Sequence, residues 1–254
     1  MKAIMLAAGL GSRLYGQDDD HPHKSLLRFG GKSLIERHVD ILRACGVKEL
    51  VLVTGFRADT LLAEVARIGA TDFVRPVLNP DYRRGSVVSL WYARQTLLDG
   101  DSCLCMDADV LYHRGLIERL IASPHETCML LDRDFEAGEE PVKLCIRDGK
   151  PVEFRKAIGD IKADFMGEWP GFLKLSPKAA RALVAAMQDF VAGPGADKPM
   201  EEAIREIMLN GKGGKFGWED VTGLPWIEID FPGDVGRARD MILPQIETPT
   251  ATPM

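Results

Sequence analysis

The chain has 254 residues, 46% of them hydrophobic, which is enough to bury the core of one large domain or two small ones. Its net charge of −6 and pI of about 5.5 argue against extended contact with a nucleic-acid backbone. The five cysteines form no CxxC pair and no apolar stretch approaches the roughly 20 residues that cross a bilayer, so we expect reduced thiols in a cytoplasmic protein without a membrane span.

Apolar strand candidates alternate with amphipathic helix candidates over the first half of the chain. The expected strands cover residues 2–7, 49–55, 72–79 and 102–109, and the expected helices cover 33–46, 58–69, 86–98 and 113–123. The strand runs are continuous in apolar residues, which is typical of a parallel sheet buried on both faces. The alternation predicts an α/β fold with a Rossmann-like, mostly parallel sheet and helices on both faces.

Strand candidates dominate the next part of the chain. They cover residues 127–132, 142–154 with a hairpin at Asp148-Gly149, and 171–176; helices are expected at 176–193 and 199–211, a strand at 226–230 and a last helix at 232–243. The end is rich in proline and threonine. We therefore expect one domain over residues 1–243, with a strand-rich second half folded onto the sheet, and a flexible tail over 244–254.

The segment LAAGLGSRL directly follows the first strand, where open α/β sheets bind their ligands. Gly9 and Gly11 let backbone amides approach an anion, and the cations Arg13 and Lys24 would neutralise a polyphosphate. A plain glycine turn with solvated cations is the alternative. A dinucleotide site is disfavoured, because Leu14 stands in place of a third glycine and the second strand ends in TGFR without an acidic residue.

Carboxylates follow two of the predicted strands. Asp107 and Asp109 end the run CLCMDAD, and Glu228 and Asp230 end the run WIEID. Residues two apart on a strand share a face, and Mg²⁺ prefers oxygen ligands. These residues are therefore candidates for a magnesium site, the alternative being ordinary turn or helix-capping roles.

The run from Lys2 to Phe56 resembles the opening of the nucleotidyltransferases that make NDP-sugars and CDP-alcohols: strand, L-A-A-G-x-G-x-R, loop, lysine, helix. The resemblance implies a GT-A-like fold, with a nucleotide-binding half over residues 1–125 and an acceptor-binding half over 126–243. It implies catalytic roles for Arg13 and Lys24 on the triphosphate, and Mg²⁺ held by Asp109 and Asp230. The nucleotide-binding residues that we expect are Leu6, Ala7, Ala8, Gly9, Gly11, Ser86, Ser89 and Asp107.

Two features of the loop depart from that family. His23 stands where the family usually has a proline immediately before the lysine. The preceding acidic run, Asp18 to Asp20, would repel a triphosphate, so we expect it to be solvated and to point away from the site.

The segment at residues 79–97, NPDYRRGSVVSLWYARQTL, resembles that of cytidylyltransferases acting on phosphocholine, 2-aminoethylphosphonate or inositol phosphate. The resemblance implies transfer of CMP from CTP to a small phosphorylated or phosphonylated alcohol or amine, with release of pyrophosphate. Ser86 opens a helix whose N-terminus would hold an anion or a base edge. The expected acceptor-binding residues are Lys143, Lys156, Glu168, Trp169 and Glu201, where an acidic group beside an aromatic face suits an amine. Each also has an ordinary structural alternative.

Two rival functions remain open. One is a sugar-1-phosphate nucleotidyltransferase that makes an NDP-sugar. The other is a non-catalytic, nucleotide-sensing subunit with this fold, against which the joint presence of Arg13, Lys24, Asp109 and Asp230 argues. The resemblance also makes a homodimer an expected assembly, and no nucleic-acid partner is expected.

Overall fold

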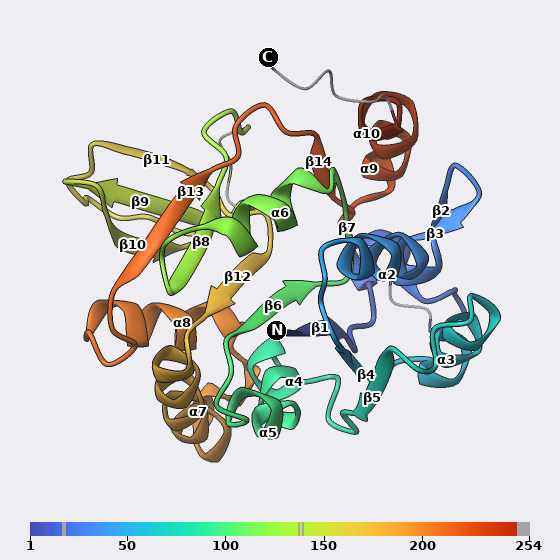
Figure 1. Ribbon diagram of the computed structural model, residues 1–254, viewed down its shortest axis with the longest axis horizontal. Helices are drawn as coiled ribbons and strands as arrows, with labels where there is room; N and C mark the ends of the chain where they lie inside the picture. Colours follow the sequence, from blue (N-terminus) through green and yellow to red (C-terminus); the bar gives the residue numbers. More distant parts are fainter. Residues whose placement is uncertain (17–18, 137, 139, 248–254) are drawn as a thin grey trace.

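The computed structural model describes residues 1–16, 19–136, 138 and 140–247 (Figure 1). Its strands are β1 (Lys2–Ala7), β2 (Arg28–Phe29), β3 (Lys32–Ser33), β4 (Leu50–Thr54), β5 (Val74–Leu78), β6 (Cys103–Asp107), β7 (Val110–Tyr112), β8 (Thr127–Leu131), β9 (Lys143–Arg147), β10 (Lys150–Arg155), β11 (Phe165–Glu168), β12 (Phe172–Leu175), β13 (Phe216–Asp220) and β14 (Trp226–Glu228). Its α-helices are α1 (Ser12–Tyr15), α2 (Leu34–Ala44), α3 (Ala58–Arg67), α4 (Ser86–Tyr92), α5 (Arg94–Leu97), α6 (Gly115–Ala122), α7 (Pro177–Ala192), α8 (Met200–Leu209), α9 (Pro232–Arg237) and α10 (Leu243–Glu247). Short 3₁₀ turns, η1 (Lys24–Leu26) and η2 (Pro194–Asp197), and a π-helical turn, η3 (Ala238–Ile242), complete the set.

The central sheet has seven strands in the order β13-β8-β12-β6-β1-β4-β5. β12 runs antiparallel to both of its neighbours and the remaining pairs are parallel, so the prediction of a mostly parallel α/β sheet is confirmed. The second half of the chain supplies β8, β12 and β13 to this sheet. It also forms a separate three-stranded sheet in the order β10-β9-β11, which lies beside β13 of the central sheet (Figure 1).

Two hydrophobic cores cover the two faces of the central sheet. Ile4 of β1 packs with residues of α4, α5, α7 and α8, whereas Met5 packs with residues of α2, α3 and α6. Successive side chains of a strand point to opposite faces, so the apolar run of β1 is buried on both sides. Figure 1 shows the two groups of helices on opposite sides of β1 and β6. Among the described residues, no helix is both long and apolar enough to cross a bilayer.

Five strands and one helix break were not expected from the sequence. The helix expected at 86–98 is interrupted at Ala93, between α4 and α5. The strands that were missed are short or lack apolar alternation: β2, β3, β7, β11 and β13. In β13, Gly217 is required because a Cβ there would collide with the ring of His125. The segment is a strand because all five of its residues pair with β8, and its local β-propensity is weak.

The closing helical segment extends further than expected. α10 continues through Glu247, past residue 244 where the flexible tail was expected to begin, and Leu243 is buried in a small third core with Leu14 and Ile229. Residues 248–254 of the expected tail lie outside the described part of the chain. This third core secures the C-terminal helices beside the loop that follows β1.

Candidate active site

A cavity of about 330 Å³ lies at the carboxyl ends of β1 and β6. It collects residues from the glycine loop, from η1, from the start of α4 and from the segment after β6. The lining includes all of the predicted site residues except Lys143 and Glu168. These residues meet because strands and helices alternate along the chain, so that the loops following the parallel strands gather at one edge of the sheet.

The glycine loop turns sharply between β1 and α1. Gly11 has a φ of 70°, a left-handed conformation that favours glycine, and its carbonyl accepts from the amides of Leu14 and Tyr15. A Cβ at Gly11 would lie 3.4 Å from the Tyr15 ring and 3.9 Å from Lys24 Cβ. The turn therefore sends the chain into α1 and leaves room for Lys24 beside it.

Ion pairs link the two expected catalytic cations to the carboxylates. Lys24 Nζ lies 2.8 Å from Asp109 Oδ2 and 2.9 Å from Asp230 Oδ1. Arg13 Nη1 lies 2.9 Å from Asp230 Oδ2 and 2.6 Å from Glu140 Oε2. The structure thus brings Arg13, Lys24, Asp109 and Asp230 together, as the sequence predicted that they would share a site.

This network perturbs the ionisation of its members. Burial acts to lower the pKa of Lys24, but Asp109 and Asp230 outweigh it and raise the pKa above the ordinary lysine value. Burial would likewise raise the pKa of Asp109, but the Lys24 ammonium prevails and holds it below the ordinary value. The pair is therefore charged across the neutral pH range.

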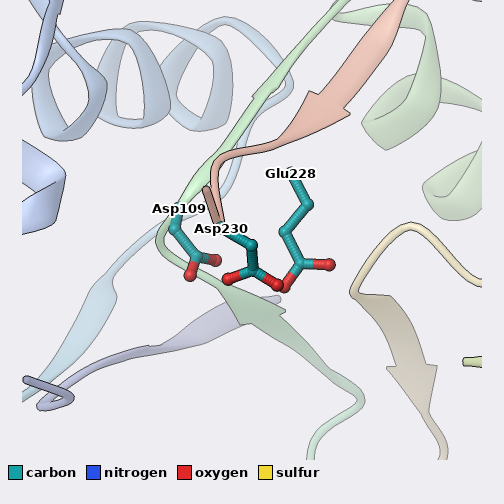
Figure 2. Close-up of side chains that lie close together, drawn as sticks. All are labelled: Asp109, Glu228 and Asp230. Atoms are coloured by element: carbon teal, nitrogen blue, oxygen red, sulfur yellow. The ribbon is translucent and has the colours of Figure 1, made fainter. Parts of the chain in front are cut away.

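Three carboxylates form a cluster at the floor of the cavity (Figure 2). One carboxylate oxygen from each of Asp109, Glu228 and Asp230 lies within 4.8 Å of the other two. β7 and β14 pair in an antiparallel ribbon, and the Ile229 amide donates to the Asp109 carbonyl at 2.9 Å. This ribbon joins segments about 120 residues apart in sequence, which no local pattern predicts.

Glu228 was one of the carboxylates that the sequence offered for magnesium, but the family resemblance pointed only to Asp109 and Asp230 as ligands. Its pKa is raised well above the ordinary value, because it is buried and because Asp109 and Asp230 lie close. The signal was present in the sequence, since Glu228 and Asp230 are two residues apart at the end of one strand. An oxygen-only cluster of this kind fits a hard divalent cation such as Mg²⁺.

Two further acidic residues face the cavity from other directions. Burial, and then the carboxylates of Asp109, Glu201, Glu228 and Asp230, raise the pKa of Asp107 well above its ordinary value. Burial also raises the pKa of Glu201, whose Oε2 is buried and has no hydrogen-bond partner within the described part of the chain. The unpaired oxygen of Glu201 would therefore favour a hydroxyl or ammonium donor of a ligand.

The start of α4 is arranged differently from the expectation. The Gly85 amide donates to the Ala196 carbonyl at 3.0 Å, and the Val87 amide donates to the Lys198 carbonyl at 3.4 Å. These two amides at the start of α4 are therefore already hydrogen-bonded to the η2 segment and the residue after it. Ser86 Oγ accepts from the Met200 amide at 2.8 Å and so caps α8, which begins beside Glu201. Ser86 therefore lines the cavity while holding α8 in place.

Ser89 is fixed from behind rather than from the cavity. Its Oγ accepts from Asn79 Nδ2 at 2.9 Å, and Asn79 is itself completely buried. The Ser89 hydroxyl proton remains a donor that can be directed to a ligand in the cavity.

The expected acceptor-binding residues fall into different environments. Lys143 is 8% exposed, and its Nζ donates to the carbonyls of Gly138, Pro141 and Lys156 at 2.6, 3.2 and 2.8 Å. These contacts commit Lys143 to holding two chain segments together. Lys156 lines the cavity and pairs with Glu140 Oε2 at 2.9 Å, the same oxygen that Arg13 contacts.

Trp169 lines the cavity but is only 4% exposed. Its Nε1 donates to the Phe172 carbonyl at 2.8 Å, and its ring meets Phe154 edge-on. Its role is thus largely one of packing. Glu168 instead lines a second cavity, and burial together with nearby Asp132 raises its pKa to about 7.

This second cavity, of about 670 Å³, shares Glu140, Glu228 and Asp230 with the first. Among the described residues of its lining, acidic side chains far outnumber cationic ones, which are represented by Arg237. Trp226 contributes an indole whose Nε1 donates to Asp132 Oδ2 at 2.7 Å. The acidic lining residues are Asp132, Asp134, Glu136, Glu140, Glu168, Glu228, Asp230 and Asp234.

Sequence reasoning missed several other residues of the first cavity. Tyr82 and Arg84 line the cavity and lie in the segment that resembles cytidylyltransferases, so their place in that segment could have identified them as site residues. Gly171 has a φ of 87°, and a Cβ there would lie 2.8 Å from Asp107 Oδ2. No periodicity signalled His23, Glu140 or Gly171, because turns bring each of them to the cavity.

The acidic loop before Lys24 is tethered to two arginines. Arg57 Nη2 lies 2.9 Å from Asp20 Oδ1, and Arg83 Nη2 lies 2.5 Å from Asp19 Oδ2. These pairs offset the negative charge that would otherwise repel an anion. Asp18 lies outside the described residues.

Comparisons with known proteins agree with this arrangement. The model of the MobA-like NTP transferase domain matches residues 3–167. The CMP-5'-(3-aminopropyl)phosphonate synthase of Streptomyces rubellomurinus is 26% identical over 94% of this chain and 38% of its own length. The bifunctional IPC transferase and DIPP synthase of Rubrobacter xylanophilus is 28% identical over 95% of this chain and 52% of its own. The chain thus spans about half or less of the length of these relatives.

A solved structure shares the fold. The CTP:phosphocholine cytidylyltransferase of Streptococcus pneumoniae superimposes with a TM-score of 0.72, covering 94% of this chain and 97% of the other, at 21% sequence identity. At that identity the likeness concerns the fold alone. It agrees with the predicted nucleotidyltransferase architecture.

Proposed function

Because the chain belongs to the family of MobA-like NTP transferase domains, we propose that it is a Mg²⁺-dependent cytidylyltransferase. It transfers CMP from CTP to a small phosphorylated or phosphonylated alcohol or amine and releases pyrophosphate. One observation carries the proposal: two cations and three carboxylates from distant segments converge on the floor of the first cavity, where the second cavity adjoins it.

The reaction forms one P–O bond and breaks another. An oxygen of the acceptor phosphate or phosphonate attacks the α-phosphorus of CTP, and the bond from that phosphorus to the bridging oxygen breaks. Pyrophosphate leaves with the electron pair. Lys24 and Arg13 stabilise the negative charge that grows on the phosphate oxygens, more in the transition state than in the ground state. The acceptor is already ionised at neutral pH, so that no strong base is required.

The cluster of Asp109, Glu228 and Asp230 fits a magnesium ion, because all three supply carboxylate oxygens. When bound, the ion would screen the charges of the two phosphorylated substrates from each other. Lys24 shares Asp109 and Asp230 with such an ion, and a nucleotide phosphate offers the ammonium an alternative partner. Arg13 and Lys156, which now meet at Glu140 Oε2, would likewise take a phosphate oxygen in place of that carboxylate.

In this proposal the acceptor occupies the second cavity, with its phosphate near Asp230, which lines both cavities. The excess of carboxylates there favours an acceptor with an ammonium or quaternary amine at its far end. Trp226 and Phe231 provide aromatic surface for the same group. The names of the phosphonate synthase and the phosphocholine enzyme among the relatives agree with this class of acceptor.

A pyrophosphate-release assay on the purified chain tests the proposal. CTP, UTP, GTP and dTTP are each combined with phosphocholine, 2-aminoethylphosphonate, inositol 1-phosphate and glucose 1-phosphate, with Mg²⁺ and with excess EDTA. We expect turnover with CTP and an amine-bearing acceptor, and its loss with EDTA. Turnover with UTP or dTTP and glucose 1-phosphate alone would replace this assignment by an NDP-sugar synthase. CTP binding without turnover on any acceptor would favour a nucleotide sensor.

A further inference from the structure

His23 lies at the junction of three parts of the site. Its ring is 2% exposed and lines the first cavity. Nε2 lies 2.8 Å from the Ala7 carbonyl at the end of β1, and Nδ1 accepts from the Ser25 amide at 3.0 Å. Ser25 in turn donates its hydroxyl to the Ala108 carbonyl, at 3.3 Å, between Asp107 and Asp109. One imidazole therefore connects the glycine loop with the turn that carries Lys24.

Only one form of the ring satisfies both hydrogen bonds. The Ala7 carbonyl accepts only, so Nε2 must carry the proton; the Ser25 amide donates only, so Nδ1 must present its lone pair. The other neutral tautomer would lose both bonds. A protonated ring would keep the bond to Ala7 but direct a second N–H at the Ser25 amide.

The surroundings favour the neutral ring. Burial lowers the pKa of His23 below the ordinary value, and His21 and Lys24 act in the same direction, whereas the Ala7 hydrogen bond and Asp109 act against it. Ser25 and Lys24 belong to η1, for which His23 is the N-cap residue. The ring thus caps the turn from which Lys24 reaches Asp109 and Asp230.

We propose that His23 is a positioning residue for nucleotidyl transfer, whose Nε2-protonated ring sets the placement of Lys24 relative to the glycine loop. The proposal rests on the transferase activity proposed above, but it concerns a separate element of the site. Its two hydrogen bonds have distinct tasks. The bond to Ala7 holds the nucleotide-binding loop, and the bond from Ser25 holds the turn that presents Lys24.

Two substitutions separate these tasks. In His23→Asn, the amide oxygen can replace Nδ1 as the acceptor for the Ser25 amide, while the bond to Ala7 is lost. In His23→Gln, the longer amide can donate to Ala7, while the cap on Ser25 is lost. We expect His23→Gln to lower kcat by about 10–100-fold, since small misplacements of a catalytic group have costs of this order. We expect His23→Asn to retain most of kcat and to raise the KM for CTP several-fold.

A matched control is available outside the cavity. His113 Nδ1 accepts from the Gly115 amide at 3.1 Å, two residues along the chain, as His23 does from Ser25. His113 lies outside the lining of the first cavity, so that His113→Gln should change kcat and the KM for CTP less than twofold. The proposal would be overturned if both His23 variants lowered kcat and raised the KM for CTP by the same factors. It would also be overturned if His113→Gln had as large an effect as His23→Gln.

The pH profile supplies a second readout. Protonation of His23 would remove the cap on the Lys24 turn, so wild-type kcat should fall only at pH values below the ordinary histidine pKa. The asparagine side chain gains no proton in this range, so His23→Asn should show a shallower acid limb. An acid limb identical in the two proteins would contradict the assigned role.

Nitrogen-15 NMR of the imidazoles tests the ring state without any activity. The signal lost in His23→Asn identifies His23, and we expect a neutral ring protonated on Nε2 at pH 7.5. A Nδ1-protonated or charged ring at that pH would refute the proposal even if the protein is an active transferase. If the wild-type protein has no transferase activity, the tautomer, together with CTP binding by the two variants, still decides whether His23 organises the loop.

Discussion

Replacing Lys24 by methionine keeps the length of the side chain but removes the cation that lies between the buried Asp230 and the partly buried Asp109. Lys24 Nζ has charged hydrogen bonds of 2.8 Å to Asp109 and 2.9 Å to Asp230, and the Lys24 and Asp230 side chains are 11% exposed. Hydrogen bonds to charged groups contribute about 1.5–3 kcal/mol each, and protonation of an orphaned carboxylate limits the loss. We expect a drop in unfolding free energy of about 3 kcal/mol at pH 7.5, or roughly 6–12 °C in the thermal midpoint.

The pH dependence of this loss is the sharper test. In the wild type the pKa of Asp109 is lowered, so its stabilisation is complete above the unfolded pKa of about 3.9 and is lost only as the pH falls through the folded value. Without Lys24, burial raises the pKa of Asp109 instead, and the folded protein then binds more protons than the unfolded one. Stability of the variant should therefore rise as the pH falls from 7.5 to 5, relative to the wild type.

The assay is thermal unfolding of both proteins at pH 7.5, 6.5, 5.5 and 5.0, together with CTP turnover at pH 7.5. The difference in midpoint should shrink steadily with falling pH, and kcat should fall by about 10²–10³-fold, as for loss of one transition-state contact. Lys156→Met is the control for stability, because its partner Glu140 is half exposed and such pairs contribute about 0.2–1 kcal/mol. A midpoint difference that is constant or grows toward pH 5 would refute the reasoning.

Three further substitutions test other parts of the site. Burial and Asp132 raise the pKa of Glu168 to about 7, so the wild-type KM for an amine-bearing acceptor should fall as Glu168 ionises between pH 6 and 8. Glu168→Gln should abolish this pH dependence and leave the KM for CTP unchanged. If the variant keeps the pH dependence, another group is responsible for it. Gly171→Ala places a Cβ 2.8 Å from Asp107 Oδ2 at a φ of 87° and should destabilise the protein by about 1–3 kcal/mol in chemical denaturation, more than Gly100→Ala, which has a φ of 88° and open space around it; equal losses would mean that the contact with Asp107 is relieved without cost. Lys143→Met leaves three carbonyls without their donor and should lower stability by about 1–3 kcal/mol while changing the acceptor KM less than threefold; a tenfold rise in that KM would instead assign Lys143 to the acceptor phosphate.

Glu140 lines both cavities. Its Oε2 contacts both Arg13 and Lys156, and hydrogen bonding from Lys156, with a smaller contribution from Arg13, keeps the pKa of Glu140 below the ordinary value. The two cations that would bind substrate phosphate are therefore neutralised by the protein itself. Under the proposed function, a substrate phosphate would compete with the Glu140 carboxylate for these two cations.

The amino-acid sequence by itself indicated a mostly parallel sheet with helices on both faces, and the loop beside which a ligand is expected. Apolar runs such as β1, buried on both faces, predict a covered parallel sheet, and the glycine loop that follows β1 predicts where a ligand binds. Asp109 was identifiable as a candidate because it ends a predicted strand and matches the family motif. These features are local: they depend on side-chain alternation and on the conformation of a few consecutive residues.

Only the tertiary structure decided which of the candidate residues meet. The ribbon of β7 and β14 places Glu228 and Asp230 beside Asp109, and the turn capped by His23 presents Lys24 to the same carboxylates. Lys143 looked like a phosphate ligand in the sequence, but its ammonium is engaged by three backbone carbonyls. Local periodicity carries no information about such contacts, because they depend on the register of strands and on turns that join residues far apart in the chain.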